Sequence, residues 1–227
     1  ASNMAYGQDA RVPSHAPDQR ADGYRNARDV NTAAPATASP YYGAPHPSAA
    51  AFAKATRRQQ IMVATSSIGP GATNMVTAAG VAMSNRLPVL FISGDTFTSR
   101  LPDPVLQQVE HFGMPSITVN DAFQPVTRYW DRITHPAQIL SSLPQAVTTM
   151  MDPADCGPAF LGLPQDLAAE AYEFPEEFFA TTVRTMPRPR PDLGELEEAT
   201  RVLRAANKPV IIAGGGVHYS LAEAELA

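Results

Sequence analysis

Residues 61–84, IMVATSSIGPGATNMVTAAGVAMS, decide the fold class of this chain. The stretch opens with a short apolar run at residues 61–65, which has the length of a strand. A turn rich in glycine and proline follows at once, and residues 72–84 then have the small side chains of a closely packed helix. A strand that passes through a tight turn into a helix is the first half of a βα unit, so an α/β fold is predicted.

The rest of the chain repeats this alternation. Further strands are expected at residues 89–93, 117–119 and 159–163, and helices at residues 48–56 and 136–151. The strands are nearly continuous apolar runs and do not alternate with polar residues, as is typical of a parallel sheet that is covered on both faces. The sequence therefore predicts a parallel sheet flanked by helices.

Changes in composition divide the chain into four parts. Residues 1–47 contain few Val, Ile or Leu residues and are expected to be a flexible tail, because they cannot bury enough apolar surface to fold. Residues 48–172 are expected to form the α/β domain, and the proline-rich residues 173–192 are interpreted as a linker. Residues 193–227 contain a helix, an expected strand at 209–213 and a glycine turn. They are interpreted as the truncated start of a second, Rossmann-like α/β domain.

Composition excludes several classes of protein. The formal net charge of the 227 residues is −5, which does not fit a nucleic-acid-binding protein. No apolar run approaches the roughly 18–20 residues that a membrane span needs, so no membrane partner is expected. The single cysteine, Cys156, rules out an intrachain disulfide. This fits the expected cytoplasmic location, and a secreted protein without disulfides would look the same.

The turn at residues 66–74 is the strongest candidate for a binding site. Its glycines, Gly69 and Gly71, let the backbone turn sharply and let a ligand approach closely. The start of the following helix offers free N–H groups to a polar or anionic ligand. The spacing matches neither the dinucleotide fingerprint nor the Walker loop. From the residues alone, a simple strand-to-helix connection remains an equal alternative.

The segment TSSIGPGATNMVTA at residues 65–78 resembles the pyrimidine-binding (PYR) domain of thiamine diphosphate (ThDP) enzymes related to acetolactate synthase. The resemblance continues in order along the chain. It includes NRLPVLFISGDT (85–96), VLQQVE (105–110), ITVNDAFQPVTRYWDRI (117–133) and GPAFLGLPQDLAAEAY (157–172), and KPVIIAGGGVHYS (208–220) resembles the opening of the central domain of these enzymes. Within that group, the segments RLPDPVLQQVE, FQPVTRYWDRI and IIAGGGVHYS look most like the hydrolases of inositol breakdown.

The resemblance implies a set of site residues. Gly69, Pro70, Gly71 and Asn74 match the turn near the cofactor pyrimidine, and Gln107 or Gln108 matches a glutamine that reaches the active site from a partner subunit. Asp95 and Thr96 follow a strand end and are expected to line the substrate crevice. Structural roles stay open for three of them: Asn74 as a helix cap, Gln107 as a solvated side chain and Asp95 as a turn-fixing residue.

The resemblance also implies a reaction. In the family, a glutamate of the PYR domain activates ThDP, whose carbanion attacks a cyclic diketone, and water then completes opening of the ring. The cofactor is the electron sink. Its diphosphate is held through Mg²⁺ on a separate domain. A homo-oligomer is expected, because PYR domains of this family lie at subunit interfaces.

The sequence departs from the family at the activating glutamate. Ungapped extension places Tyr42 there, and no acidic residue lies between Asp29 and Asp95. No catalytic residue and no metal ligand is therefore assigned, and His111, His135 and His218 are too scattered for a metal site. We expect the chain alone to be inactive and not to bind ThDP tightly.

Two other readings of the function stay open: a non-catalytic PYR-like dimerisation module, and a portion of an acetolactate synthase-type enzyme. Residues 128–132 are interpreted as packing and surface ion pairs, with Trp130 as a core or interface anchor.

Overall fold

The computed structural model describes residues 45–100, 109, 111 and 113–227. Most of the expected tail, together with Tyr42, Gln107 and Gln108, lies outside these described residues. The chain divides into two units, Ala1–Pro40 and Tyr41–Ala227, and the account below concerns the second.

A four-stranded parallel sheet forms the centre of this unit. Its strands are β1 (Val63–Ser66), β2 (Leu90–Asp95), β3 (Tyr129–Arg132) and β4 (Ala159–Pro164). They lie in the order β1-β2-β4-β3, and every neighbouring pair is parallel. All four carboxyl ends therefore meet at one edge of the sheet, which is where α/β folds place their ligands. The predicted parallel sheet flanked by helices is confirmed.

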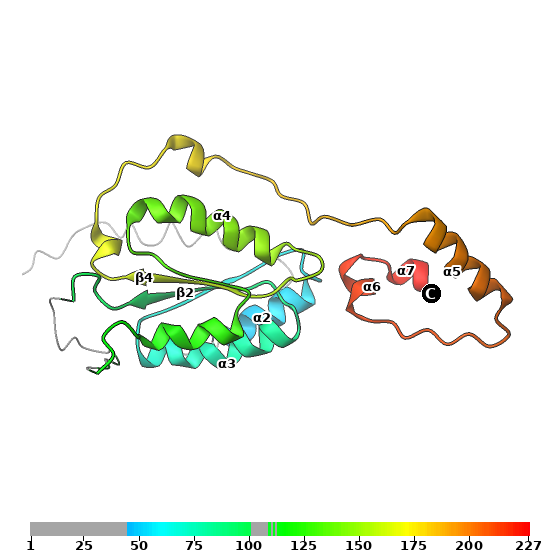
Figure 1. Cartoon of the computed structure of the whole chain (residues 1–227), viewed down its shortest axis with the longest axis horizontal. Helices are drawn as coiled ribbons and strands as arrows, with labels where there is room; N and C mark the ends of the chain where they lie inside the picture. Colours follow the sequence, from blue (N-terminus) through cyan, green and yellow to red (C-terminus); the bar gives the residue numbers. More distant parts are fainter. Residues whose placement is uncertain (1–44, 101–108, 110, 112) are drawn as a thin grey trace, which may run out of the picture. The chain divides into compact units, whose positions relative to one another are not determined.

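Helices cover both faces of the sheet, which explains the continuous apolar character of its inner strands. Figure 1 shows α2 (Pro45–Ala55) and α3 (Pro70–Ser84) on one face and α4 (Ile139–Met150) on the other. The first face buries Phe91 and Phe160 together with Phe123, and the Phe123 and Phe160 rings stack with 4.2 Å between centroids. The second face buries residues such as Leu161 against α4.

Within the α/β domain, two expected elements differ from the structure and one strand was not expected. Helix α2 begins at Pro45, three residues before the expected start. The strand expected at residues 117–119 is wrong. Thr118 caps the 3-10 helix η1 (Val119–Val126), and its hydroxyl accepts a hydrogen bond from the Asn120 N–H. Strand β3 was not predicted, because its sequence, YWDR, is half polar.

The short helix η2 (Pro136–Gln138) lies between β3 and α4. The helices described after β4 are η3 (Leu167–Ala169), η4 (Glu176–Phe179), α5 (Leu193–Ala205), α6 (Gly215–Tyr219) and α7 (Glu223–Leu226). The predicted helix at the start of the last part of the chain is confirmed as α5. The strand expected at residues 209–213 is wrong: Val210 and Ile212 are 88% and 94% exposed, and no described strand pairs with them. Among the described residues, no helix is long and apolar enough to cross a membrane.

Candidate functional site

The turn between β1 and α3 has a backbone that requires glycine. Gly69 has φ 79° and ψ −131°, in a region that L residues rarely adopt. Pro70 follows as the first residue of α3, where its missing N–H costs no helical hydrogen bond. No side chain caps the start of α3, so N–H groups of its first turn have no side-chain acceptor. A ligand with polar or anionic atoms can use these donors.

Two further glycines bring the end of β2 against this turn. A Cβ on Gly94 would lie 3.2 Å from the backbone nitrogen of Ile68, and a Cβ on Gly71 would lie 2.8 Å from the Ser67 hydroxyl oxygen. Both distances are shorter than ordinary carbon contacts, so side chains are excluded at these positions without local movement. The turn and the end of β2 therefore form one continuous wall of backbone.

Asp95 anchors the end of β2 beneath this wall. Its side chain is fully buried. One carboxylate oxygen accepts a hydrogen bond from the Thr96 N–H at 2.8 Å, and the other accepts from Arg132 Nε at 2.7 Å. Thr96 follows as a half-buried residue at the edge. The structural role that the sequence left open for Asp95 is present, and the crevice role of both residues stays a prediction.

Arg132, at the end of β3, links three parts of the edge. Besides Asp95, its Nη2 donates to Thr118 Oγ1 at 2.9 Å and to Asp121 Oδ2 at 2.8 Å. Burial by itself would lower the pKa of Arg132, but the hydrogen bonds from Arg132 to Asp95 and Asp121 outweigh that effect and raise the pKa above its usual value. The guanidinium therefore stays charged and locks the edge together.

Asn120, on η1, completes this arrangement. It is buried, and its Nδ2 donates to the Gly94 carbonyl at 2.8 Å, while its own backbone carbonyl accepts from Trp130 Nε1 at 3.0 Å. Its Oδ1 has no hydrogen-bond partner among the described residues. Trp130 packs against the core, which confirms its interpretation as a core anchor.

Asp166, which follows β4, holds the loop after β2. Its carboxylate accepts hydrogen bonds from the Thr98 N–H at 3.0 Å, the Thr98 hydroxyl at 2.7 Å and the Ser99 N–H at 3.2 Å. Partial burial would raise the pKa of Asp166, but the hydrogen bonds from Thr98 and Ser99 outweigh it and lower the pKa. This tether positions the chain just before the segment that contains Gln107 and Gln108, which lie outside the described residues.

The structure brings some of the predicted site residues together and separates one. Gly69, Pro70 and Gly71 share the carboxyl edge with Asp95 and Thr96. Asn74 instead lines a shallow groove of about 290 Å³ between α2 and α3, and no described hydrogen bond makes it a helix cap.

Sequence reasoning missed Arg132, Asn120 and Asp166. Of these three residues, only Arg132 could have been singled out from the sequence, because it lies in the dense polar stretch 128–132. The interpretation of that stretch as packing and surface ion pairs is wrong for the ion pair of Arg132 with the buried Asp95.

No cluster of three or more potential metal ligands occurs among the described residues. His135 Nδ1 accepts a hydrogen bond from the Ala137 N–H and thereby caps η2, and His218 pairs with Glu223 at 3.0 Å. Both histidines thus have local structural partners.

Comparison with protein families first identifies the class of enzyme that this domain resembles. Residues 46–114 match the family described as thiamine pyrophosphate enzyme, N-terminal TPP binding domain; thiamine pyrophosphate is ThDP. The matched segment contains all of α2 but its first residue, and the whole of β1, the GPG turn, α3 and β2. The resemblance of this domain to ThDP enzymes is therefore confirmed, and the parallel sheet with helices on both faces is consistent with it.

Comparison with individual curated proteins shows which enzymes of this class the chain is similar to. The chain is 49% identical over 172 residues to the 3D-(3,5/4)-trihydroxycyclohexane-1,2-dione hydrolase of Geobacillus thermodenitrificans, which covers 76% of this chain and 27% of the relative. It is 49% identical over 178 residues to the hydrolase of the same name from Bacillus subtilis, covering 78% and 28%. The Clostridium tetani hydrolase gives 49% identity over 179 residues. The chain thus spans little more than a quarter of the length of these relatives.

The described residues fit one wall of a ThDP site. Backbone donors at the start of α3, next to the backbone wall that Gly71 and Gly94 allow to pack closely, suit the polar edge of a planar ring. The activating carboxylate is not found among them. Of the acids at this edge, Asp95 and Asp121 are held by Arg132, and Asp166 is held by Thr98 and Ser99. The acids described at this edge are therefore all engaged in hydrogen bonds within the chain.

Proposed function

We propose that this chain supplies the pyrimidine-binding wall of a ThDP-dependent hydrolase that opens the ring of trihydroxycyclohexane-1,2-dione. The observation that carries the proposal is the uncapped GPG turn at the carboxyl edge, inside the segment that matches the ThDP-binding family. The named hydrolase relatives, at 49% identity, support the choice of substrate over that of an acetolactate synthase.

In this proposal the chain binds and orients, and ThDP supplies the electron sink that cleavage of a carbon–carbon bond needs. The first-turn N–H groups of α3 hold the polar edge of the aminopyrimidine. Arg132, through Asp95, fixes the end of β2 so that Gly94 stays against the turn and Thr96 faces the crevice. Mg²⁺ and the diphosphate are assigned to another domain, as in the family.

The chain by itself is proposed to lack turnover, because no described acid at the edge is free to activate the cofactor. A ring-opening assay with the purified chain, ThDP and Mg²⁺ tests this directly. Measurable turnover would contradict it. Such a result would leave the binding proposal intact, since the two are measured separately.

Binding is tested by an NMR titration with ThDP, in which amide shifts should concentrate at residues 69–73. Two substitutions in the same helix form a matched pair. Gly71→Ala places a Cβ 2.8 Å from the Ser67 hydroxyl oxygen, whereas Gly80→Ala meets only Val126, at 3.9 Å. Gly71→Ala should weaken binding about tenfold, as expected for the loss of one good polar contact, while Gly80→Ala leaves it unchanged. Equal binding by both variants and the wild type would refute the proposed site.

A dimerisation module remains the second candidate, favoured by one observation. The groove between α2 and α3 has a mainly apolar lining, and Val81 at its side is 48% exposed. If a second copy packs there, sedimentation should show a dimer that Val81→Lys disrupts. Val183→Lys is the matched control, because Val183 is also exposed but does not line the groove. A monomeric wild type would exclude this role.

A further inference from the structure

A buried arginine lies at the amino edge of the sheet, opposite the GPG turn. Arg58 stands between α2 and β1, before the first strand begins, and only 7% of its surface is exposed. Its Nε has no hydrogen-bond partner, and Arg58 takes part in no ion pair within the described part of the chain. Burial of a guanidinium without a counter-charge is costly, so the site favours an anion that the described residues do not supply.

The contacts of Arg58 leave its donors usable. Its guanidinium carbon lies 3.3 Å from the centroid of the Tyr219 ring, so the aromatic ring covers one face of the planar group. Stacking on a face does not engage the in-plane N–H groups, and the geometry of these groups matches the two oxygens of a carboxylate or phosphate. The stacking of Arg58 on Tyr219 is therefore compatible with binding of an anion by the in-plane N–H groups of the guanidinium.

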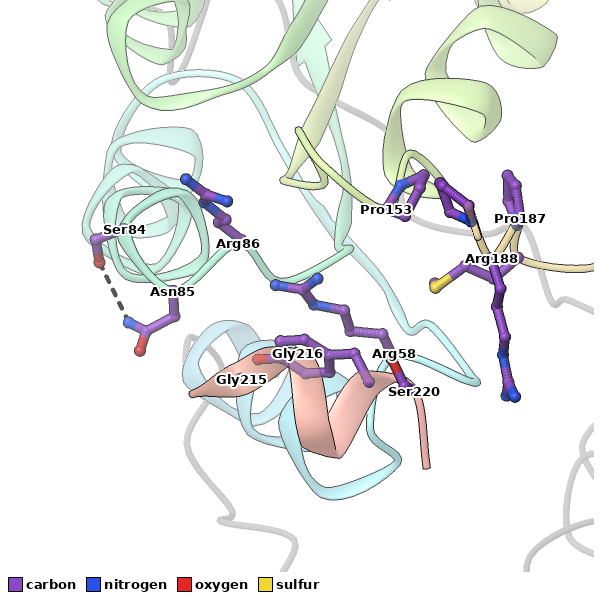
Figure 2. A pocket seen from close by; sticks show the side chains of 13 residues that line it. Arg58, Ser84, Asn85, Arg86, Pro153, Pro187, Arg188, Gly215, Gly216 and Ser220 are labelled. Atoms are coloured by element: carbon purple, nitrogen blue, oxygen red, sulfur yellow. Dashed lines mark hydrogen bonds between the residues drawn. The ribbon is translucent and has the colours of Figure 1, made fainter. Parts of the chain in front are cut away.

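A pocket of about 460 Å³ adjoins this side chain (Figure 2). That volume lies within the range of small-molecule sites. Arg58, Arg86 and Arg188 line the pocket, and no Asp or Glu is among its described lining residues. Figure 2 shows the Arg58 side chain extending toward Arg86, whereas the guanidinium of Arg188 points away.

The acids nearby are already engaged. Asp155 pairs with Arg128 at 3.1 Å, and the Asp152 carboxylate accepts the N–H groups of Ala154 and Asp155. Glu223 pairs with Arg57 at 3.2 Å. None of these carboxylates is described as contacting Arg58, so the pocket keeps a positive charge.

The backbone supports a built site at this edge. Arg58 has φ 63° and Arg86 has φ 52°, both in the left-handed region that arginine rarely adopts. Arg86 is further held by the hydrogen bond that its Nη1 donates to the Ala154 carbonyl at 3.1 Å. Strained residues held by their surroundings concentrate at ligand sites.

We propose that this pocket binds a small-molecule oxyanion, a phosphate or a carboxylate, with Arg58 as its bidentate partner and Arg86 as a second charge. The site is separate from the cofactor edge and does not depend on the proposed hydrolase function. It is a binding site and no chemical step is assigned to it.

Thermal unfolding of the full chain with added oxyanion tests the proposal. The probes are pyrophosphate for the phosphate class and citrate for the carboxylate class, with sodium chloride at matched ionic strength as the reference. Ligands that bind only the folded state raise the melting temperature in a saturable way. At least one probe should do so, and the probe with the higher affinity identifies the class of ligand.

Arg58→Gln should lower the affinity about tenfold or more, as expected for the loss of a charge-assisted bidentate contact. Arg201→Gln removes the same charge from α5, outside the pocket lining, and should keep the affinity of the wild type. The ligand-free Arg58→Gln protein should melt no lower than the wild type, because an unpaired buried charge is removed. A merely structural Arg58 would instead lower the melting temperature.

A second matched pair covers the case in which Arg58→Gln does not fold. Gly216 lines the pocket and Gly214 does not, and a Cβ at either position meets no atom within 4 Å. Gly216→Asp should abolish the response by supplying an internal counter-charge, while Gly214→Asp retains it. No saturable response of the wild type to either probe, or an unchanged response in both Arg58→Gln and Gly216→Asp, would overturn the proposal.

Discussion

Arg132 at the end of β3 reaches across the neighbouring strand β4 to contact Asp95 at the end of β2, with 2.7 Å between Arg132 Nε and Asp95 Oδ2. Gly162 is the β4 residue in register with Arg132. A Cβ on Gly162 would lie 2.9 Å from Asp95 Oδ2, so the glycine leaves the space that the ion pair occupies. One buried pair thus ties three strands together directly beneath the candidate site.

Removal of Arg132 should strongly destabilise the fold. Arg132→Met leaves the Asp95 carboxylate fully buried without its partner, and such a loss typically costs about 3–5 kcal/mol of unfolding free energy. Arg128→Met is the control, because Arg128 pairs with the largely exposed Asp155, and pairs of that kind contribute about 0–1 kcal/mol. Urea unfolding measures both variants. A similar loss in the two would contradict the special role of the Arg132 pair.

Gly162→Ala should also destabilise, through overpacking. The new methyl group meets Asp95 Oδ2, and this oxygen cannot move away easily because Asp95 is held by Arg132 and by the Thr96 N–H. Overpacking of this kind costs about 1–3 kcal/mol. Gly80→Ala, inside α3, should be neutral or stabilising because alanine favours helices. Unfolding free energies from denaturant titration compare the two, and an unaffected Gly162→Ala would show that the edge is adaptable.

The inner strands could be predicted because each is a continuous apolar run. Residues 89–93 and 159–163 became β2 and β4, which are buried on both faces. Strand β3 could not be predicted in this way, because the polar groups of Asp131 and Arg132 find partners only after the chain folds. The strand predicted at residues 117–119 is absent for a related reason: Thr118 forms a capping box with Asp121 and starts η1.

The GPG turn was found from sequence because glycine and proline mark a turn locally. The buried network beneath it was not, since Asp95 and Arg132 are 37 residues apart and nothing near either one indicates the other. The exposed run at residues 209–213 shows the opposite error, a predicted element that the structure does not contain among the described residues. Its apolar residues predict a strand, but a strand needs a pairing partner, and none is present among the described residues.

Acid should release the loop after β2. The pKa of Asp166 is lowered in the folded protein, so its stabilising contribution is present above the ordinary value of 3.8 and is lost as the pH falls through the lower, folded pKa. The amide shifts of Thr98 and Ser99 should therefore titrate together, with a midpoint below 3.8. In Asp166→Asn this titration should be absent, because the amide side chain carries no titrating proton. A midpoint at or above the ordinary value would show that the tether is weak.

Cys156 should react slowly with alkylating reagents while the protein is folded. Burial raises the pKa of its thiol to about 11, and its Sγ contacts the Met150 carbonyl oxygen at 3.1 Å. Only the thiolate attacks, and with that pKa about one thiol in a thousand is ionised at mildly alkaline pH. Since Cys156 is the only cysteine of the chain, labelling by iodoacetamide reports on this site alone. Denaturant should restore the ordinary thiol pKa of about 8.5 and accelerate labelling at least tenfold. If the folded protein reacted as fast as the unfolded chain, Cys156 would have to be accessible and the packing between α4 and β4 would have to open readily.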